Sequence, residues 1–174
     1  MSKYETPDYD ILIKEDDYEL RKYVDFFIVE YENSDDPEIK NGFGSLFKYI
    51  SNNNKKNEKI SMTVPVIQEE TTENKKMAFV VPKKYGNQIP EPNSSNLTVK
   101  KFDEGLFASI QYSGSSNKTK EIKMKKKLEE WIRKQDFQTE SNYMFASYNA
   151  PFTPPMFRRN EILVRVIKKW ERTI

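Results

Sequence analysis

The chain has 174 residues, of which 36% are hydrophobic and 32% are charged, and this composition is typical of a soluble globular protein. It contains no Cys and no His, which excludes disulfides, thiolate nucleophiles, Cys-based zinc sites, a Ser-His-Asp triad and a heme ligated by His. The formal net charge is only +2, so no overall field points to nucleic acid or to anionic lipid.

The N-terminal sequence MSKYETPDYD has no apolar segment of the kind that secretion signals contain. Nowhere do about 18 apolar residues follow one another, as a membrane-spanning helix requires. We therefore expect a cytoplasmic protein with no membrane span.

The first half of the chain predicts strands around one helix. Residues 9–15 (YDILIKE) favour a strand, and residues 19–31 favour one or two more with a break near Asp25. Asp36 followed by Pro37 is a typical helix start, and the polar tract SNNNKKNEK ends that helix. Two strands are then expected within residues 59–68 (KISMTVPVIQ) and 76–82 (KMAFVVP).

The second half repeats this order after residues 85–96, which have the composition of a linker. Strands are expected at residues 97–102 and 106–112, a long helix from about residue 118 to residue 135, and strands at residues 143–148 and 161–167. The order of elements predicts two ββαββ halves, at about residues 8–82 and 97–168, within one domain of residues 1–174. Such halves most simply give an α+β protein with a curved or barrel-like antiparallel sheet and one helix per half.

The first predicted helix contains the sequence GFGSLFKY, in which two glycines interrupt an apolar pattern. Each interior glycine costs about 1 kcal/mol relative to alanine. On a helical wheel, four apolar residues fall within about 60° of one another and should face the core. These are Ile39, Phe43, Leu46 and Ile50. Phe47 lies at the edge of that stripe.

A second row of residues along the same predicted helix could bind a ligand. Lys40, Gly44 and Lys48 follow one another at intervals of four residues. A flat apolar molecule could lie against Phe43 and Phe47, approach the backbone closely at Gly44, and pair its carboxylates with the lysines. The alternative is that Gly44 faces a neighbouring strand and that the lysine stems cover an apolar edge. Gly42 lies on the other side of the wheel, where close helix–strand packing is the simpler explanation.

Three other stretches could have functions. The lysines between residues 118 and 127 could bind nucleic acid, but interspersed glutamates and an apolar stripe favour a solvated helix face. Glu15, Asp16 and Asp17 lack the glycine of a calcium loop, so we expect no metal site and no catalytic pair. The proline-containing loop before Glu161 is either a stiff strand connection or a rim that presents Phe152, Met156 and Arg158 to a ligand.

Several motifs together resemble the SOUL heme-binding protein family. They are YELRKY at residues 18–23, KISMTVPV at residues 59–66, MAFVVP at residues 77–82, and SYNAP and RRNEI near the C-terminus. The similarity runs from about Tyr4 to Ile167. It implies a distorted eight-stranded antiparallel β-barrel with two helices, built from two ββαββ repeats.

The resemblance also implies a site and a ligand. In similar proteins a heme or related tetrapyrrole is thought to lie in a shallow apolar groove beside the first helix, with basic side chains at its propionates. On this chain the groove positions are Lys40, Phe43, Phe47 and Lys48. Tyr148 and Arg158 are implied nearby from the C-terminal motif. With Gly44 from the wheel, these residues form the predicted binding site.

The absence of His leaves Tyr, Met or no protein ligand at all for a heme iron, whereas apolar binding and propionate pairing need no iron bond. The leading hypothesis is a non-enzymatic tetrapyrrole buffer or carrier with no nucleic-acid partner. The alternatives are an effector-binding domain for another lipophilic small molecule, a protein-interaction module that uses the same groove, and an enzyme acting on tetrapyrroles.

Overall fold

A computed structural model describes residues 4–149 and 153–169 of the chain. These residues form two helices, two short 3-10 turns and ten strands, so the protein is of the α+β class. The structure consists of two compact units. Unit 1 contains Asp25–Asp103 with the described residues before Asp8, and unit 2 contains Asp8–Val24 with the described residues from Glu104 onward.

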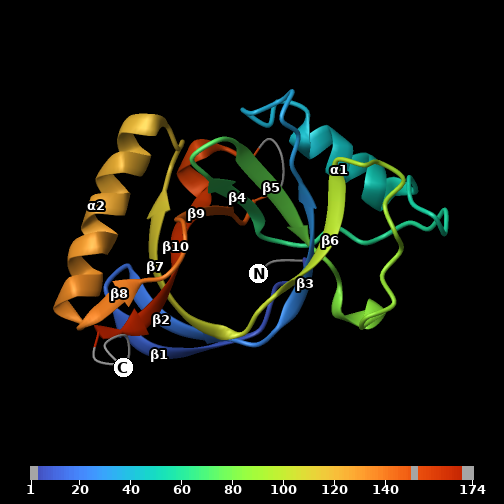
Figure 1. The fold of residues 1–174 in the computed structure, drawn as a ribbon. Coiled ribbons are helices and arrows are strands. Elements are labelled where there is room, and N and C mark those ends of the chain that lie inside the picture. The colour runs from blue at the N-terminus through green and yellow to red at the C-terminus, as the bar shows by residue number, and fades with distance from the viewer. Residues whose placement is uncertain (1–3, 150–152, 170–174) are drawn as a thin grey trace. The chain divides into compact units, whose positions relative to one another are not determined.

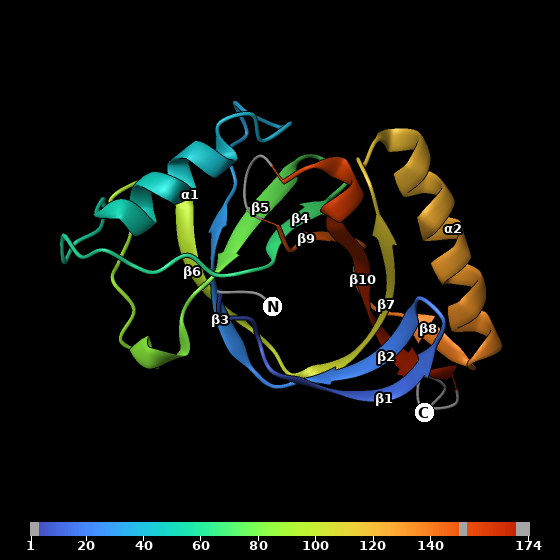
Figure 2. The same ribbon diagram turned by 180° about the vertical axis from the view of Figure 1, so that it is seen from behind.

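Unit 1 is an antiparallel sheet in the order β4-β5-β3-β6 with helix α1 on one face. Its elements are β3 (Phe26–Tyr31), α1 (Gly42–Ser51), β4 (Val66–Glu70), β5 (Lys75–Val80), the turn η1 (Lys83–Tyr85) and β6 (Leu97–Phe102). Helix α1 packs its buried residues on side chains of β3 and β5, and Figure 2 shows it beside β3 and β6. The core contains Val29, Tyr31, Leu46, Tyr49 and Phe79.

Unit 2 is an antiparallel sheet in the order β1-β2-β7-β10-β9, with β8 also paired to β10. Its elements are β1 (Tyr9–Glu15), β2 (Tyr18–Tyr23), β7 (Gly105–Ser113), α2 (Lys118–Lys134), β8 (Phe137–Thr139), β9 (Met144–Ser147), the turn η2 (Pro155–Phe157) and β10 (Arg159–Lys168). Helix α2 lies along one face of this sheet (Figure 1), and Leu128, Trp131 and Ile132 pack there against Leu20 and Ile162.

Most of the expected elements are confirmed, but the segment of residues 59–68 is a strand only from Val66 onward. Ile60 and Val64 are buried without joining a ladder. The amide of Ile60 instead donates to the Ile50 carbonyl, and the Thr63 hydroxyl donates to the Val80 carbonyl at 2.6 Å. Pro65 has no amide to offer a sheet. The apolar pattern of this segment therefore indicates burial, not strand pairing.

Two further details differ from the sequence-based expectation. The described residues contain ten strands where eight were expected, and the arrangement as a barrel of two ββαββ repeats stays a prediction. Strand β8 was not expected, since three residues are too few for a periodic signal. None of the helices in the described ranges is both long and apolar enough to cross a membrane.

Candidate functional site

Helix α1 begins at Gly42, so the predicted start at Asp36 and Pro37 is wrong. The Asp36 carboxylate accepts hydrogen bonds from the amides of Lys40 (3.0 Å) and Asn41 (2.9 Å). The amide of Asn41 and the other groups around this carboxylate lower the pKa of Asp36. Ile39 has a φ of 53°, which a helix cannot contain. Asp36 thus stabilises a turn that precedes the helix, not the helix itself.

This shift of the helix start breaks the predicted lysine row. Lys40 lies in the turn before α1, so only Gly44 and Lys48 are spaced on the helix as expected. Lys40 and Lys48 are both exposed. Lys48 stands in the last turn, where a cation interacts favourably with the carbonyl end of the helix dipole.

The two glycines of α1 have different surroundings. A Cβ on Gly42 would lie 3.3 Å from both Ile39 Cβ and Tyr31 Cδ1 and 3.5 Å from Met77 Cβ. Gly42 is therefore needed for close packing of α1 on the sheet, as expected. A Cβ on Gly44 would meet no atom within 4 Å. The packing explanation for Gly44, a neighbouring strand, is wrong.

Phe43 and Phe47 form an aromatic edge beside Gly44. Their rings are stacked with centroids 6.0 Å apart and planes inclined by 18°. Phe43 is partly buried and meets the Phe79 ring edge-on at 5.3 Å, which ties it to the core. Phe47 has no such support and stays 50% exposed. The outer surface of α1 thus offers an anchored ring, an exposed ring, bare backbone and an ammonium group.

The loop after α1 has a buried polar centre that the sequence did not indicate. Asn54 is 3% exposed, and its amide donates to the carbonyls of Tyr49 (3.0 Å) and Glu58 (2.8 Å). Its side-chain oxygen accepts from the amides of Lys56 and Glu58. In a run of four similar polar residues, no sequence signal distinguishes the one that turns inward. This side chain stabilises the C-terminal end of α1.

Tyr148 and Arg158 belong to unit 2, whereas the other five predicted site residues belong to unit 1. The guanidinium of Arg159, not that of Arg158, lies over the Tyr148 ring at 4.0 Å. Burial raises the pKa of Tyr148 well above its ordinary value. Arg158 donates from Nε to the Thr153 carbonyl at 2.8 Å, so it helps to hold its own loop. A shared site for all seven residues stays a prediction.

The proline loop before Glu161 presents apolar side chains. Met156 is 75% exposed and Phe157 is 68% exposed, both within η2. The third residue of the predicted rim, Phe152, lies outside the described residues. That this loop is a rim which presents side chains to a ligand therefore stays a prediction.

A buried ionic network in unit 2 was missed from the sequence. Arg21, 1% exposed, donates to Glu161 at 2.7 Å, to Glu19 at 2.7 Å and to the Tyr23 hydroxyl at 2.9 Å. Glu161 also accepts two hydrogen bonds from Arg159. The alternation of Glu19, Arg21 and Tyr23 in YELRKY could have shown a polar sheet face. Its burial could not have been read from the sequence.

Two of the three acidic residues near the first hairpin have structural roles. Glu15 accepts a hydrogen bond from the Trp131 indole at 3.2 Å, which joins β1 to α2. Asp16 has a φ of 53° and makes the turn. Within residues 4–149 and 153–169, no cluster of acidic residues could hold a metal ion.

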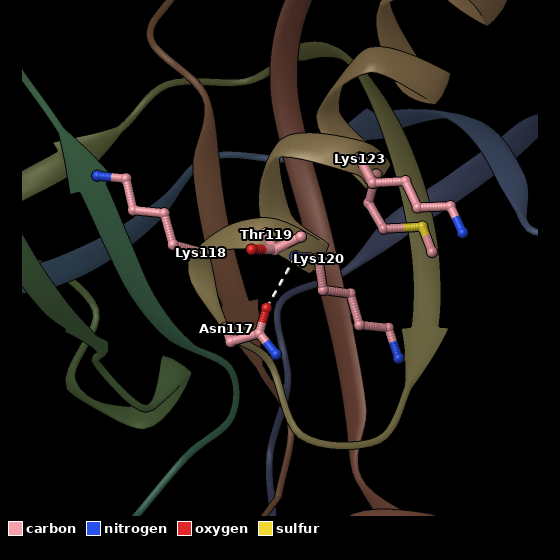
Figure 3. A pocket seen from close by; sticks show the side chains of 6 residues that line it. Asn117, Lys118, Thr119, Lys120 and Lys123 are labelled. Atoms are coloured by element: carbon pink, nitrogen blue, oxygen red, sulfur yellow. Dashed lines mark hydrogen bonds between the residues drawn. The ribbon is translucent and has the colours of Figure 1, made fainter.

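A pocket of about 570 Å³ lies at the start of α2 and was also missed. It is lined by Asn117, Lys118, Thr119, Lys120, Lys123 and Met124. In Figure 3, Lys120 and Lys123 extend to one side of the helix start and Lys118 extends to the other. The pocket has a basic lining, with one apolar residue.

These observations define an α+β protein whose helix α1 exposes an aromatic and basic surface suited to a flat anionic ligand. The chain belongs to the SOUL heme-binding protein family, whose sequence profile matches residues 4–165. The family match therefore supports non-covalent binding of heme or a related tetrapyrrole by this protein. No curated protein matches the chain.

The fold is shared with solved structures of low sequence identity. The C-terminal domain of EcmrR is similar with a TM-score of 0.60 and 11% identity, over 92% of this chain and 98% of that one. A hydrolase from Listeria innocua is similar with a TM-score of 0.59 and 10% identity, over 90% of this chain and 94% of that one. At such identities the likeness shows the fold alone.

The residues on α1 fit a tetrapyrrole. The open space above Gly44 admits a flat ring system close to the backbone, and the half-exposed Phe47 offers it a face for stacking. The exposed ammonium of Lys48 suits a propionate. With no His and no Cys in the chain, Tyr and Met are the remaining side chains of the kinds that ligate heme iron.

Proposed function

We propose that the protein is a non-enzymatic carrier or buffer of tetrapyrroles, and that the ligand lies on the outer surface of α1. The open space above Gly44 carries this proposal, because packing gives no reason for a glycine there. A glycine that destabilises its helix without a structural gain is best explained by a ligand that needs the bare backbone.

In this proposal the aromatic edge supplies most of the binding free energy. Phe47, half exposed in the free protein, is covered by the ligand, and Phe43 keeps that edge in place through Phe79. Lys48 and Lys40 pair with the propionates. Exposed ion pairs of this kind contribute about 0.2–1 kcal/mol each, so they orient the ligand more than they hold it.

The alternative of an effector-binding domain, with a lipophilic cation as its ligand, is less well supported by the charges of the protein. Such a domain needs a buried carboxylate that is free to meet the cation. Glu161, the fully buried carboxylate of unit 2, has both oxygens engaged by arginines. The exposed charges at α1 are lysines, which repel cations.

The test is titration of the purified protein with hemin and with protoporphyrin IX, followed by absorbance. We expect saturable binding of both, with similar affinity because no iron ligand is needed. Lys40→Glu combined with Lys48→Glu should weaken binding about tenfold, as expected when two exposed attractions become repulsions. Gly44→Leu should weaken it further by filling the space for the ring.

A matched control keeps the charge change and moves it to α2. Lys126→Glu combined with Lys127→Glu alters the net charge equally at two exposed positions of unit 2. This control should bind hemin like the parent protein. If the control and the α1 variant lose the same affinity, or if Gly44→Leu binds normally while folded, the α1 site is wrong.

A further inference from the structure

Helix α2 holds a large share of the positive charge of the protein. Its 17 residues include eight Lys or Arg and three Glu, which gives a formal charge of +5. Because the whole chain has a formal charge of only +2, the remaining residues together have a charge of −3. Such an asymmetry orients a protein toward an anionic partner even when its net charge is small.

The cations of α2 lie on the side that faces solvent. The buried residues of the helix are Leu128, Trp131 and Ile132, which pack in the core of unit 2. Six of the eight cations are exposed, namely Lys118, Lys123, Lys126, Lys127, Arg133 and Lys134. Of the three acids only Glu130 is exposed, and Glu121 is hydrogen-bonded to Ser116. The solvent face therefore has a net charge close to that of the helix.

Local electrostatics do not explain the lysines at the start of α2. Cations in a first turn oppose the helix dipole, at a cost of about 0.3–1 kcal/mol each. Asn117 caps this end by accepting from the amide of Lys120 at 2.9 Å, and Lys120 donates from Nζ to the Ser113 carbonyl at 2.6 Å. Lys118 and Lys123 line the basic pocket of Figure 3 and have no such partner among the described residues.

One apolar side chain indicates which anionic partner this face meets. Ile122 is 50% exposed in the middle of the lysines. Burial of its apolar surface at the boundary between lipid headgroups and acyl chains is favourable in free energy. Contact with the phosphate backbone of a nucleic acid gives no such gain. The only aromatic residue of α2, Trp131, is buried, so this helix offers no ring on which a base could stack.

We propose that the solvent face of α2 is a docking surface for membranes rich in anionic lipid. In this arrangement α2 lies in the plane of the headgroups, with its lysines on the lipid phosphates and Ile122 inserted between them. The straight helix is about 25 Å long at 1.5 Å per residue, so the cations spread over several headgroups. Binding is peripheral and reversible, and it falls with salt.

The test measures sedimentation of the full chain with vesicles of phosphatidylcholine alone or with phosphatidylglycerol added. We expect binding to the anionic vesicles at low salt, release at high salt, and no binding to the neutral vesicles. Each cation contributes about a fivefold change in partition. The loss of two cations in Lys126→Glu combined with Lys127→Glu should therefore reduce binding at least about 25-fold.

Two further variants separate the alternatives. Lys55→Glu combined with Lys56→Glu changes the net charge equally at exposed positions in unit 1, and it should bind vesicles nearly as well as the parent protein. Ile122→Ser should weaken vesicle binding with the lysines intact.

Three results would overturn the proposal. They are no binding to anionic vesicles at low salt, equal losses in the two charge variants, and tighter binding to duplex DNA or RNA with no effect of Ile122→Ser. The last result would assign the surface to nucleic acid.

Discussion

The two glycines of α1 give opposite predictions for the same substitution. Gly44→Ala should raise the free energy of unfolding by about 0.5–1 kcal/mol, since alanine is the better helix former and its Cβ enters open space. Because position 44 is in the first turn of α1, we expect the lower end of that range.

Gly42→Ala gains the same helix propensity, but it places a Cβ 3.3 Å from Tyr31 Cδ1 and from Ile39 Cβ. Tyr31 is 1% exposed, and its hydroxyl donates to Asp36 at 2.8 Å, so the ring cannot move aside freely. Overpacking of this kind costs about 1–3 kcal/mol and exceeds the helix gain. We expect a net destabilisation of about 1 kcal/mol.

The assay is urea unfolding of both variants and the parent, followed by circular dichroism and by Trp fluorescence. The two variants should differ by about 1.5 kcal/mol, which at this chain length corresponds to about 3–6 °C in Tm. Equal effects of the two substitutions, or a stabilising Gly42→Ala, would refute the assignment of Gly42 to packing and Gly44 to open surface. A stabilised Gly44→Ala that also binds hemin more weakly would show directly that this glycine serves the ligand.

Two other predictions concern groups buried away from α1. Burial raises the pKa of both Tyr23 and Tyr49 to about 12, so these phenols should ionise after the exposed tyrosines in an ultraviolet titration. The stability that they contribute is present below about pH 10, the ordinary Tyr pKa, and is lost as the pH rises through about 12. Simultaneous titration of all tyrosines near pH 10 in the folded protein would contradict this. Arg21→Met leaves Glu161 buried without one of its partners and should destabilise the protein by about 3–5 kcal/mol in urea unfolding. The double variant with Glu161→Gln should lose less free energy of unfolding than the sum of the losses in the two single variants. Strict additivity of these losses would argue against an interaction between Arg21 and Glu161.

Secondary structure was largely predictable because the chain repeats simple periodicities. The apolar stripe of α2 matches its buried residues in the structure, and β7 and β10 each contain a run of four consecutive buried residues. The errors arose where burial occurs without regular structure. Residues 60–64 are apolar and buried but outside a ladder, and Asp36 and Pro37 resemble a helix start but form a turn.

The candidate site was predictable in part. The spacing of Phe43, Gly44, Phe47 and Lys48 was enough to place them together on the outer surface of one helix. The spacing also placed Lys40 in that row, which is wrong because Ile39 leaves the helical region. The resemblance implied Arg158 near Tyr148, but the guanidinium of Arg159 lies over that ring. Arg158 ends the turn η2 and β10 begins at Arg159, so only the position at which the strand starts decides which arginine meets the ring.

By itself, the sequence determined what chemistry is absent and which segments form helices and strands. The lack of His and Cys and the short-range periodicities are properties of composition and neighbouring residues. Only the tertiary structure decided which glycine packs against the sheet and which one faces open space, and only it showed that Arg21 and Glu161 meet although they are 140 residues apart. These facts depend on side chains brought together from distant parts of the chain, and a local pattern carries no information about them.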